Sequence, residues 1–250
     1  MSRALPLLVA LAGLGGGPAL AAEGPAGQVT NVVGTGSMVR AAKAAVPVRQ
    51  KDSVFVGDRI DTREQSVVRI LLGGKATVTI RELSSLTVTE EPSRASVELH
   101  GGKVAVQVNP ALMKKGDVVH VYTPNAVAAV RGSILIAELA GADDTQESTL
   151  SALEATLPIV VATRAAPDQG QPLQPSQAVA VTGRRATARL GAVRALSAQE
   201  VARLRELLVL PTVDRRGLRG VTQGSGPGPA APLPGPGFRP APPSPPSSHR

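Results

Sequence analysis

The stretch that decides the fold is VYTPNAVAAVRGS, Val121 to Ser133, in which a Thr-Pro turn leads into a small-residue strand that ends in Val-Arg-Gly-Ser. Pro124 fixes its own φ and disfavours helical backbone at Thr123, so the preceding strand is expected to end in a stiff bend. Gly132 allows a turn or bulge that a residue with a Cβ atom would resist. The candidate residues for a fold signature or an interaction site are Thr123, Pro124, Arg131, Gly132 and Ser133.

Around this stretch, from Gln28 to Thr182, short β-branched runs are separated by Gly, Pro, Asp and Asn, and few segments repeat at helical spacing. Val104, Val106 and Val108 alternate with less apolar residues, as in a half-buried strand. We therefore predict an all-β domain with an aliphatic core. Its expected strands cover residues 28–33, 37–41, 66–72, 76–80, 85–89, 95–99, 103–108, 118–122, 134–139, 158–163 and 178–181.

A short internal repeat is present in the same region. Residues 72–78, LGGKATV, align with residues 100–106, HGGKVAV, at a spacing of 28. A repeating unit of this size suits a roll or a solenoid-like stack of short strands. The alternative is that two ordinary hairpin turns happen to share Gly-Gly-Lys.

The two ends of the chain differ from its middle. Residues 1–21 have the pattern of an export signal, with Arg3, a short apolar run and the small-residue site Ala19 to Ala21. The apolar run is shorter than the roughly 20 residues that span a bilayer, so no transmembrane anchor is predicted. We expect a β domain over 22–190, an amphipathic helix within 191–210 and a disordered Pro/Gly-rich basic tail over 211–250.

The helix is predicted from its start signals. Ser197 and Glu200 form a capping box, and Leu196 with Val201 forms a hydrophobic staple. Pro211 ends the pattern. An apolar stripe favours packing on the β domain, although a partner-binding helix is the alternative.

Charge and composition exclude several functions. Residues 22–182 hold 15 Lys or Arg against 16 Asp or Glu, whereas residues 183–250 hold 11 against 3, so the net charge of +8 belongs mainly to the end of the chain. Such a tail, in a chain with one Tyr, two Phe and no Trp, does not indicate a specific nucleic-acid reader. The absence of cysteine excludes disulfides and thiolate metal sites.

Catalytic and metal patterns are weak. Asp117, His120 and Ser133 are the residue types of a catalytic triad, but no nucleophile-elbow pattern surrounds the serine. The acidic turn at 143–147 lacks the Gly-centred calcium loop, and the Gly-Gly-Lys segments lack phosphate-loop spacing. The sequence therefore predicts no enzyme, no metal and no cofactor.

Arg131 is the charged residue of greatest interest. Its guanidinium is expected to satisfy backbone carbonyls or a carboxylate inside the bend. We favour this structural role over direct ligand contact, so Arg131→Ala is expected to loosen the domain.

Several segments together resemble a known family. They are VGDRIDT at 56–62, LLGGK at 71–75, LHGGKV at 99–104, the opening stretch at 121–133 and the closing strand at 173–181. In this order they resemble FecR-like periplasmic domains over roughly residues 27–182. Ser133 stands where the family usually has Thr, and Gly73 stands where Asp is usual.

The resemblance implies an exported β domain. Members of the family sit in the periplasm as the sensing half of a transmembrane regulator that governs a sigma factor. With no membrane helix or cytoplasmic segment recognised, we expect a stand-alone form in a Gram-negative envelope that acts as an interaction or signalling module with an envelope protein partner. An envelope glycan or peptidoglycan binder is the alternative, which the scarcity of aromatic residues disfavours. The oligomeric state is left open.

Overall fold

The computed structural model describes residues 24–41, 43–91, 94–141 and 145–211. The predicted export signal and the tail beyond Pro211 lie outside the described residues. No helix within these ranges is both long enough and apolar enough to cross a membrane.

Strands dominate the described residues, which confirms the predicted all-β class. The strands are β1 (Gly27–Val33), β2 (Gly36–Val39), β3 (Val46–Pro47), β4 (Ser53–Val54), β5 (Arg59–Thr62), β6 (Val67–Leu72), β7 (Ala76–Ile80), β8 (Ser85–Glu91), β9 (Arg94–Val108), β10 (Val118–Tyr122), β11 (Ala126–Val130), β12 (Ser133–Ala140), β13 (Glu147–Ala155), β14 (Ile159–Thr163), β15 (Ala166–Leu173), β16 (Gln177–Thr182), β17 (Arg189–Leu190) and β18 (Arg194–Ala195). The helices are the 3-10 turn η1 (Pro110–Leu112) and α1 (Ala198–Glu206).

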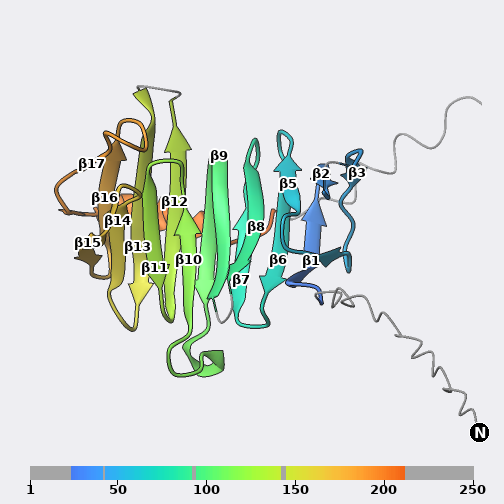
Figure 1. The fold of residues 1–250 in the computed structure, drawn as a ribbon, viewed down its shortest axis with the longest axis horizontal. Helices are drawn as coiled ribbons and strands as arrows, with labels where there is room; N and C mark the ends of the chain where they lie inside the picture. The colour runs from blue at the N-terminus through green and yellow to red at the C-terminus, as the bar shows by residue number, and fades with distance from the viewer. Residues whose placement is uncertain (1–23, 42, 92–93, 142–144, 212–250) are drawn as a thin grey trace, which may run out of the picture. The chain divides into compact units, whose positions relative to one another are not determined.

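The strands form two sheets that share β9. Sheet A has the order β4-β1-β6-β7-β9-β12-β13-β16, with β17 and β18 both on β16. Sheet B has the order β3-β2-β5-β8-β9-β10-β11-β14-β15. Neighbours are antiparallel except β9 and β10, which are parallel. Figure 1 shows β9 in the middle, between β7 and β8 on one side and β10 and β12 on the other.

A bend at Gly101 and Gly102 lets β9 join both sheets. Its residues 94–101 pair in sheet B, and its residues 102–108 pair in sheet A. Gly102 has φ +80°, a conformation that costs little only for glycine. Ser84 packs against the bend, where its Oγ accepts a 2.8 Å hydrogen bond from the Lys103 backbone N–H.

The glycine pairs of the internal repeat therefore have different roles. Gly73 and Gly74 form the tight connection between β6 and β7, as a hairpin requires. The second pair does not separate two strands, so the expectation of separate strands at 95–99 and 103–108 was wrong. Strand pairing continues through the bend, so residues 94–108 form one strand that turns from sheet B into sheet A.

The core between the sheets is aliphatic, as predicted. Val104, Val106 and Val108 of β9 face it, whereas Ala105 faces outward and packs in a separate cluster. The largest fully buried side chains are Ile60, Ile70, Leu72, Ile80, Leu86, Leu99, Leu135, Ile136, Leu150, Ile159 and Leu173. Alternation along each strand thus assigns one face to the core and leaves the other free for different contacts.

An ion pair between a buried carboxylate and a partly exposed guanidinium lies near the start of β5. Asp58 is fully buried, and its carboxylate accepts hydrogen bonds from Arg40 Nε at 2.8 Å and Nη2 at 2.7 Å. The Phe55 N–H donates to the same carboxylate at 2.8 Å, and the Arg40 guanidinium lies 4.3 Å from the centre of the Phe55 ring. The Gly57-Asp58 turn is therefore closed by its own side chain as well as by its backbone.

Helix α1 packs on the outer face of sheet A. Its apolar stripe and the preceding Leu196 are partly buried against Ala105, Ile136 and Leu153. The predicted capping box is present, and hydrogen bonds from Ser197, then from Arg194, lower the pKa of Glu200 to about 2. At the other end Arg69 Nη2 donates to the Leu208 carbonyl and Arg81 Nη1 donates to the Val209 carbonyl. Cationic donors at a helix C-terminus complement its dipole.

The bend in β9 yields a stability prediction. In Gly102→Ala the new Cβ would lie 2.6 Å from the Leu83 carbonyl oxygen and would also collide with Ser84 Oγ, at a backbone angle that disfavours alanine. We expect a loss of about 2 kcal/mol or more in the free energy of unfolding, measured by urea denaturation. Gly101→Ala is the matched control, because a Cβ there meets nothing within 4 Å, and it should change stability by less than about 0.5 kcal/mol. Equal losses in both variants would contradict this account.

Candidate functional site on the outer face of sheet B

The outer face of sheet B is hollowed. A depression of about 630 Å³ lies over strands β8, β9, β10, β11 and β14 and reaches β15. We call it the sheet B hollow, and its lining consists of Thr89, Ser96, Glu98, His120, Tyr122, Val127, Ala129, Val160, Ala162, Arg164, Pro167, Asp168 and Arg185. Polar, charged and small apolar side chains are therefore mixed on one open surface.

Strand alternation places these side chains. In β10, Val119 and Val121 enter the core, which turns His120 and Tyr122 outward. Small outward residues such as Ala129 on β11 leave space beside the longer side chains. The two rings lie with centroids 5.8 Å apart and planes inclined by 50°.

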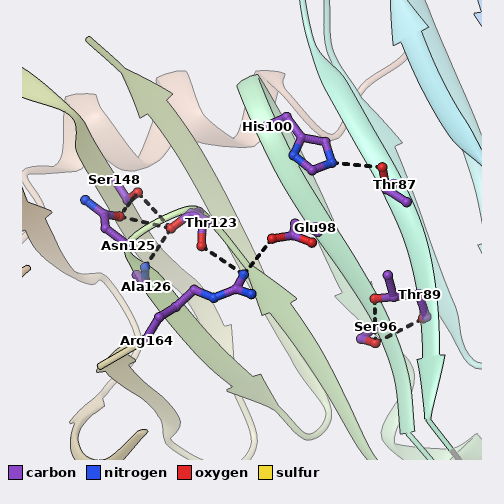
Figure 2. A network of polar contacts seen from close by, with 10 residues as sticks. All are labelled: Thr87, Thr89, Ser96, Glu98, His100, Thr123, Asn125, Ala126, Ser148 and Arg164. Carbon is purple, nitrogen blue, oxygen red and sulfur yellow. Dashed lines mark hydrogen bonds and ion pairs between the residues drawn. The ribbon is translucent and has the colours of Figure 1, made fainter. Parts of the chain in front are cut away.

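An ion pair crosses the hollow. Arg164 Nη1 donates to Glu98 Oε1 at 2.7 Å and to the Thr123 carbonyl at 3.2 Å. The same guanidinium lies 4.8 Å from the centre of the Tyr122 ring. Only 15% of the Arg164 side chain and 29% of the Glu98 side chain are exposed, so bulk water screens the pair incompletely. Figure 2 shows the two side chains reaching toward each other, Glu98 from β9 and Arg164 from the turn after β14.

Hydroxyl and imidazole groups continue this face toward β8. His100 Nε2 lies 2.8 Å from Thr87 Oγ1, and the hydroxyls of Thr89 and Ser96 are 2.9 Å apart (Figure 2). These pairs join β8 to β9 on the solvent side. Thr87 and His100 therefore extend the polar surface beyond the hollow, whereas Thr89 and Ser96 belong to its lining.

The Thr-Pro turn lies beside the hollow and is held by a buried polar network. Thr123 Oγ1 accepts from the Ala126 N–H at 3.0 Å and from the Ser148 hydroxyl at 2.8 Å, and it donates to Asn125 Oδ1 at 3.1 Å (Figure 2). Asn125 Nδ2 donates to the Val181 carbonyl at 3.0 Å and to the Gly183 carbonyl at 2.9 Å. Thr123, Asn125 and Ser148 are fully buried, so the network fastens this turn to β13 and to the end of β16.

Gly132 lies in the turn between β11 and β12, and Ser133 is the first residue of β12. Gly132 has φ +83°, and a Cβ there would lie 2.6 Å from Pro110 Cβ. The buried Ser133 donates from Oγ to the Leu157 carbonyl at 3.0 Å. Both residues thus make tight local contacts at this turn.

Arg131 lies differently from the prediction. The residue is exposed, and no hydrogen bond or ion pair joins its guanidinium to the described residues. The expectation that the guanidinium satisfies groups inside the bend is therefore not met. The backbone turn is made by Gly132, and the Arg131 side chain is available at the surface.

Asp117, His120 and Ser133 do not assemble into a triad. The Asp117 carboxylate binds Lys75 Nζ at 2.8 Å, and this hydrogen bond, followed by that from the Lys114 N–H, lowers the pKa of Asp117. Ser133 is engaged by Leu157, and His120 faces the sheet B hollow. Each group has a separate environment in the described structure.

Sequence reasoning missed Asn125 and the Glu98–Arg164 pair. Asn125 carried a usable signal, because asparagine in a turn readily bonds to nearby backbone. Glu98 and Arg164 lie 66 positions apart, and no local pattern joins them.

Comparison with known proteins supports the resemblance seen in the sequence. Residues 58–156 match the family model described as FecR protein. Two crystal structures of a protein described as an anti-sigma factor from Parabacteroides distasonis are similar at 17% identity, with TM-scores of 0.46 and 0.45. The alignments cover 59% and 58% of this chain and 64% and 62% of the others, so the chain spans less than two thirds of either. No curated protein matches.

The buried network predicts a large effect for Asn125→Ala. The substitution leaves the carbonyls of Val181 and Gly183 without their side-chain donor, and we expect a loss of about 2–3 kcal/mol in unfolding free energy. Asn31→Ala is the control, since within the described residues the Asn31 side chain forms no hydrogen bond. Thermal unfolding followed by circular dichroism measures both. A network of little importance would give the two variants similar melting temperatures.

Gly132 and Arg131, which form the turn after β11, are expected to differ in their contribution to stability. Gly132→Ala forces an unfavourable φ and a collision with Pro110, and it should cost about 2 kcal/mol. Arg131→Ala removes an exposed side chain and should cost less than about 0.5 kcal/mol. Urea denaturation of both variants is the measurement. A loss in Arg131→Ala as large as that in Gly132→Ala would restore the structural role predicted for the guanidinium.

Proposed function

Because residues 58–156 match the FecR family, we propose that this chain is a non-enzymatic, exported FecR-domain protein that serves as a protein-interaction or signalling module in the periplasm. The family match supports a signalling or regulatory role in general. Export and the nature of the partner rest on the pattern of residues 1–21 and on the surface of the β domain.

The observation that carries this proposal is the sheet B hollow. Seven of its lining residues, from Thr89 to Ala129, fall within the segment that matches the family. Its mixture of apolar groups with Glu98, Arg164 and Asp168 is suited to a protein surface, where apolar contact supplies affinity and ionic groups supply specificity.

The face of sheet B is a better docking surface than its edges. The edge strand β15 contains Pro167 and Pro172, each of which removes a backbone donor. The opposite edge, β3, has only two residues and ends in Pro47. Short, proline-containing edges discourage the addition of a partner strand.

The glycan-binding alternative is less well supported by the hollow. Tyr122 is the only tyrosine, and the Arg164 guanidinium already lies over its ring. A sugar that stacked on that face would have to displace the cation and weaken its contact with Glu98. A polypeptide partner requires no such displacement.

The test is a carboxylate placed in the hollow. Val160 is 43% exposed and lines the hollow, whereas Val46 is 51% exposed and lies on β3. Val160→Glu should weaken capture of an envelope protein by the immobilised mature chain by about tenfold or more, because an unpaired charge would be buried at the contact. Val46→Glu should leave capture unchanged.

A parallel sedimentation assay with purified peptidoglycan separates the alternatives. Under the proposal the wild-type chain stays in the supernatant. The contrary result is that the wild-type chain co-sediments with the cell wall, that Val160→Glu abolishes this binding, and that no protein is captured. That result would show that the hollow binds glycan and not protein.

A further inference from the structure

Three chain reversals meet at one end of the two sheets. They are the β9–β10 loop at 109–117, the β11–β12 turn at 131–132 and the β13–β14 turn at 156–158. Pro110 packs against Gly132, the Thr156 N–H donates to the Gly132 carbonyl at 3.2 Å, and the Leu157 carbonyl accepts from Ser133. We call this combined surface the loop tip.

The loop tip carries positive charge that the described residues do not neutralise. Lys114, Lys115 and Arg131 are exposed and line a cavity of about 240 Å³. Asp117 is the acidic residue of this lining, and it is already bound to Lys75 at 2.8 Å. Four cations thus face one carboxylate, which leaves a local charge of +3.

The loop tip also exposes apolar side chains. Leu112 is 54% exposed and Leu157 is 52% exposed. Neither side chain belongs to the core. Met113 lines the same cavity. Large apolar side chains beside uncompensated cations, all on turns, form the combination that binds the interface of an anionic bilayer, where cations meet headgroups and apolar tips enter the acyl boundary.

We propose that the loop tip docks on a surface of anionic phospholipid. The ammonium groups of Lys114 and Lys115 and the guanidinium of Arg131 bind headgroup phosphates, and Leu112 and Leu157 enter the interface. The geometry favours a lipid surface over an acidic protein because Leu112 and Leu157 project from turns and not from a strand edge that could pair with a partner's backbone. This gives Arg131 a role that its exposed position allows.

The binding test uses the chain from residue 22 to residue 250, without the predicted export signal. Binding is measured by sedimentation with phosphatidylcholine vesicles that contain or lack phosphatidylglycerol. Binding should require phosphatidylglycerol and weaken with added salt. The triple variant Lys114→Ala, Lys115→Ala, Arg131→Ala should bind about tenfold more weakly or worse. The matched control Lys43→Ala, Arg49→Ala, Arg189→Ala removes the same charge from exposed residues elsewhere and should lose less than about twofold. Both variants retain the basic tail over residues 211–250, so their difference reports the loop tip alone.

Insertion is tested with a dye attached to a single thiol, which is straightforward because the chain has no cysteine. An environment-sensitive dye on Leu112→Cys should shift its emission to the blue when anionic vesicles are added. The same dye on Val46→Cys, which is 51% exposed on β3, should not shift.

Three results would overturn the proposal. The first is equal vesicle binding by the two triple variants when both keep the wild-type melting temperature. The second is the absence of a shift at Leu112→Cys while vesicles are bound. The third is release from vesicles by low inorganic phosphate or by polyglutamate at matched ionic strength, which would identify a soluble anion or an acidic polypeptide as the ligand.

Discussion

The continuity of β9 through both sheets is the constraint on which the rest of the structure depends. One strand supplies neighbours to β8 and β10 in sheet B and to β7 and β12 in sheet A, so the sheets cannot slide past each other without breaking its ladder. The bend at Gly102 fixes where the strand changes sheets. Before the bend, Ser96 and Glu98 point into the sheet B hollow. After it, Ala105 supports α1. The path of the β9 backbone therefore determines which of its side chains lie on the outer face of sheet A and which lie on the outer face of sheet B.

Buried polar groups add the specificity that an aliphatic core lacks. Val, Ile, Leu and Ala side chains of similar size can interchange neighbours at small cost, whereas a buried carboxylate or amide tolerates only positions that satisfy its hydrogen bonds. Asp58 with Arg40 fixes the β5 end of the molecule, and the network of Thr123, Asn125 and Ser148 fixes the other. In a chain without disulfides, these networks help to hold segments that are distant in the sequence in register.

Much of the β structure was predictable because alternation of β-branched residues is a local signal. Two strands of five or more residues escaped it for identifiable reasons. β13 is rich in the helix-forming residues Ala, Leu and Glu, and β15 contains two prolines and a glycine. The capping box at Ser197 was predicted because its spacing is local. The candidate site was much harder to predict from the sequence. Glu98 and Arg164 meet only after β9, β10, β11 and β14 have paired, and Arg131 was assigned to the bend because sequence cannot distinguish a turn made by glycine from one made by its neighbour.

The position of Tyr122 has an optical consequence. The chain contains one tyrosine and no tryptophan, so nearly all of its near-ultraviolet absorbance and intrinsic emission come from a single ring on the rim of the sheet B hollow. The Arg164 guanidinium over this ring and the nearby His120 make its emission sensitive to any rearrangement of charge beside it. The unmodified protein therefore carries its own spectroscopic reporter for the occupancy of this face.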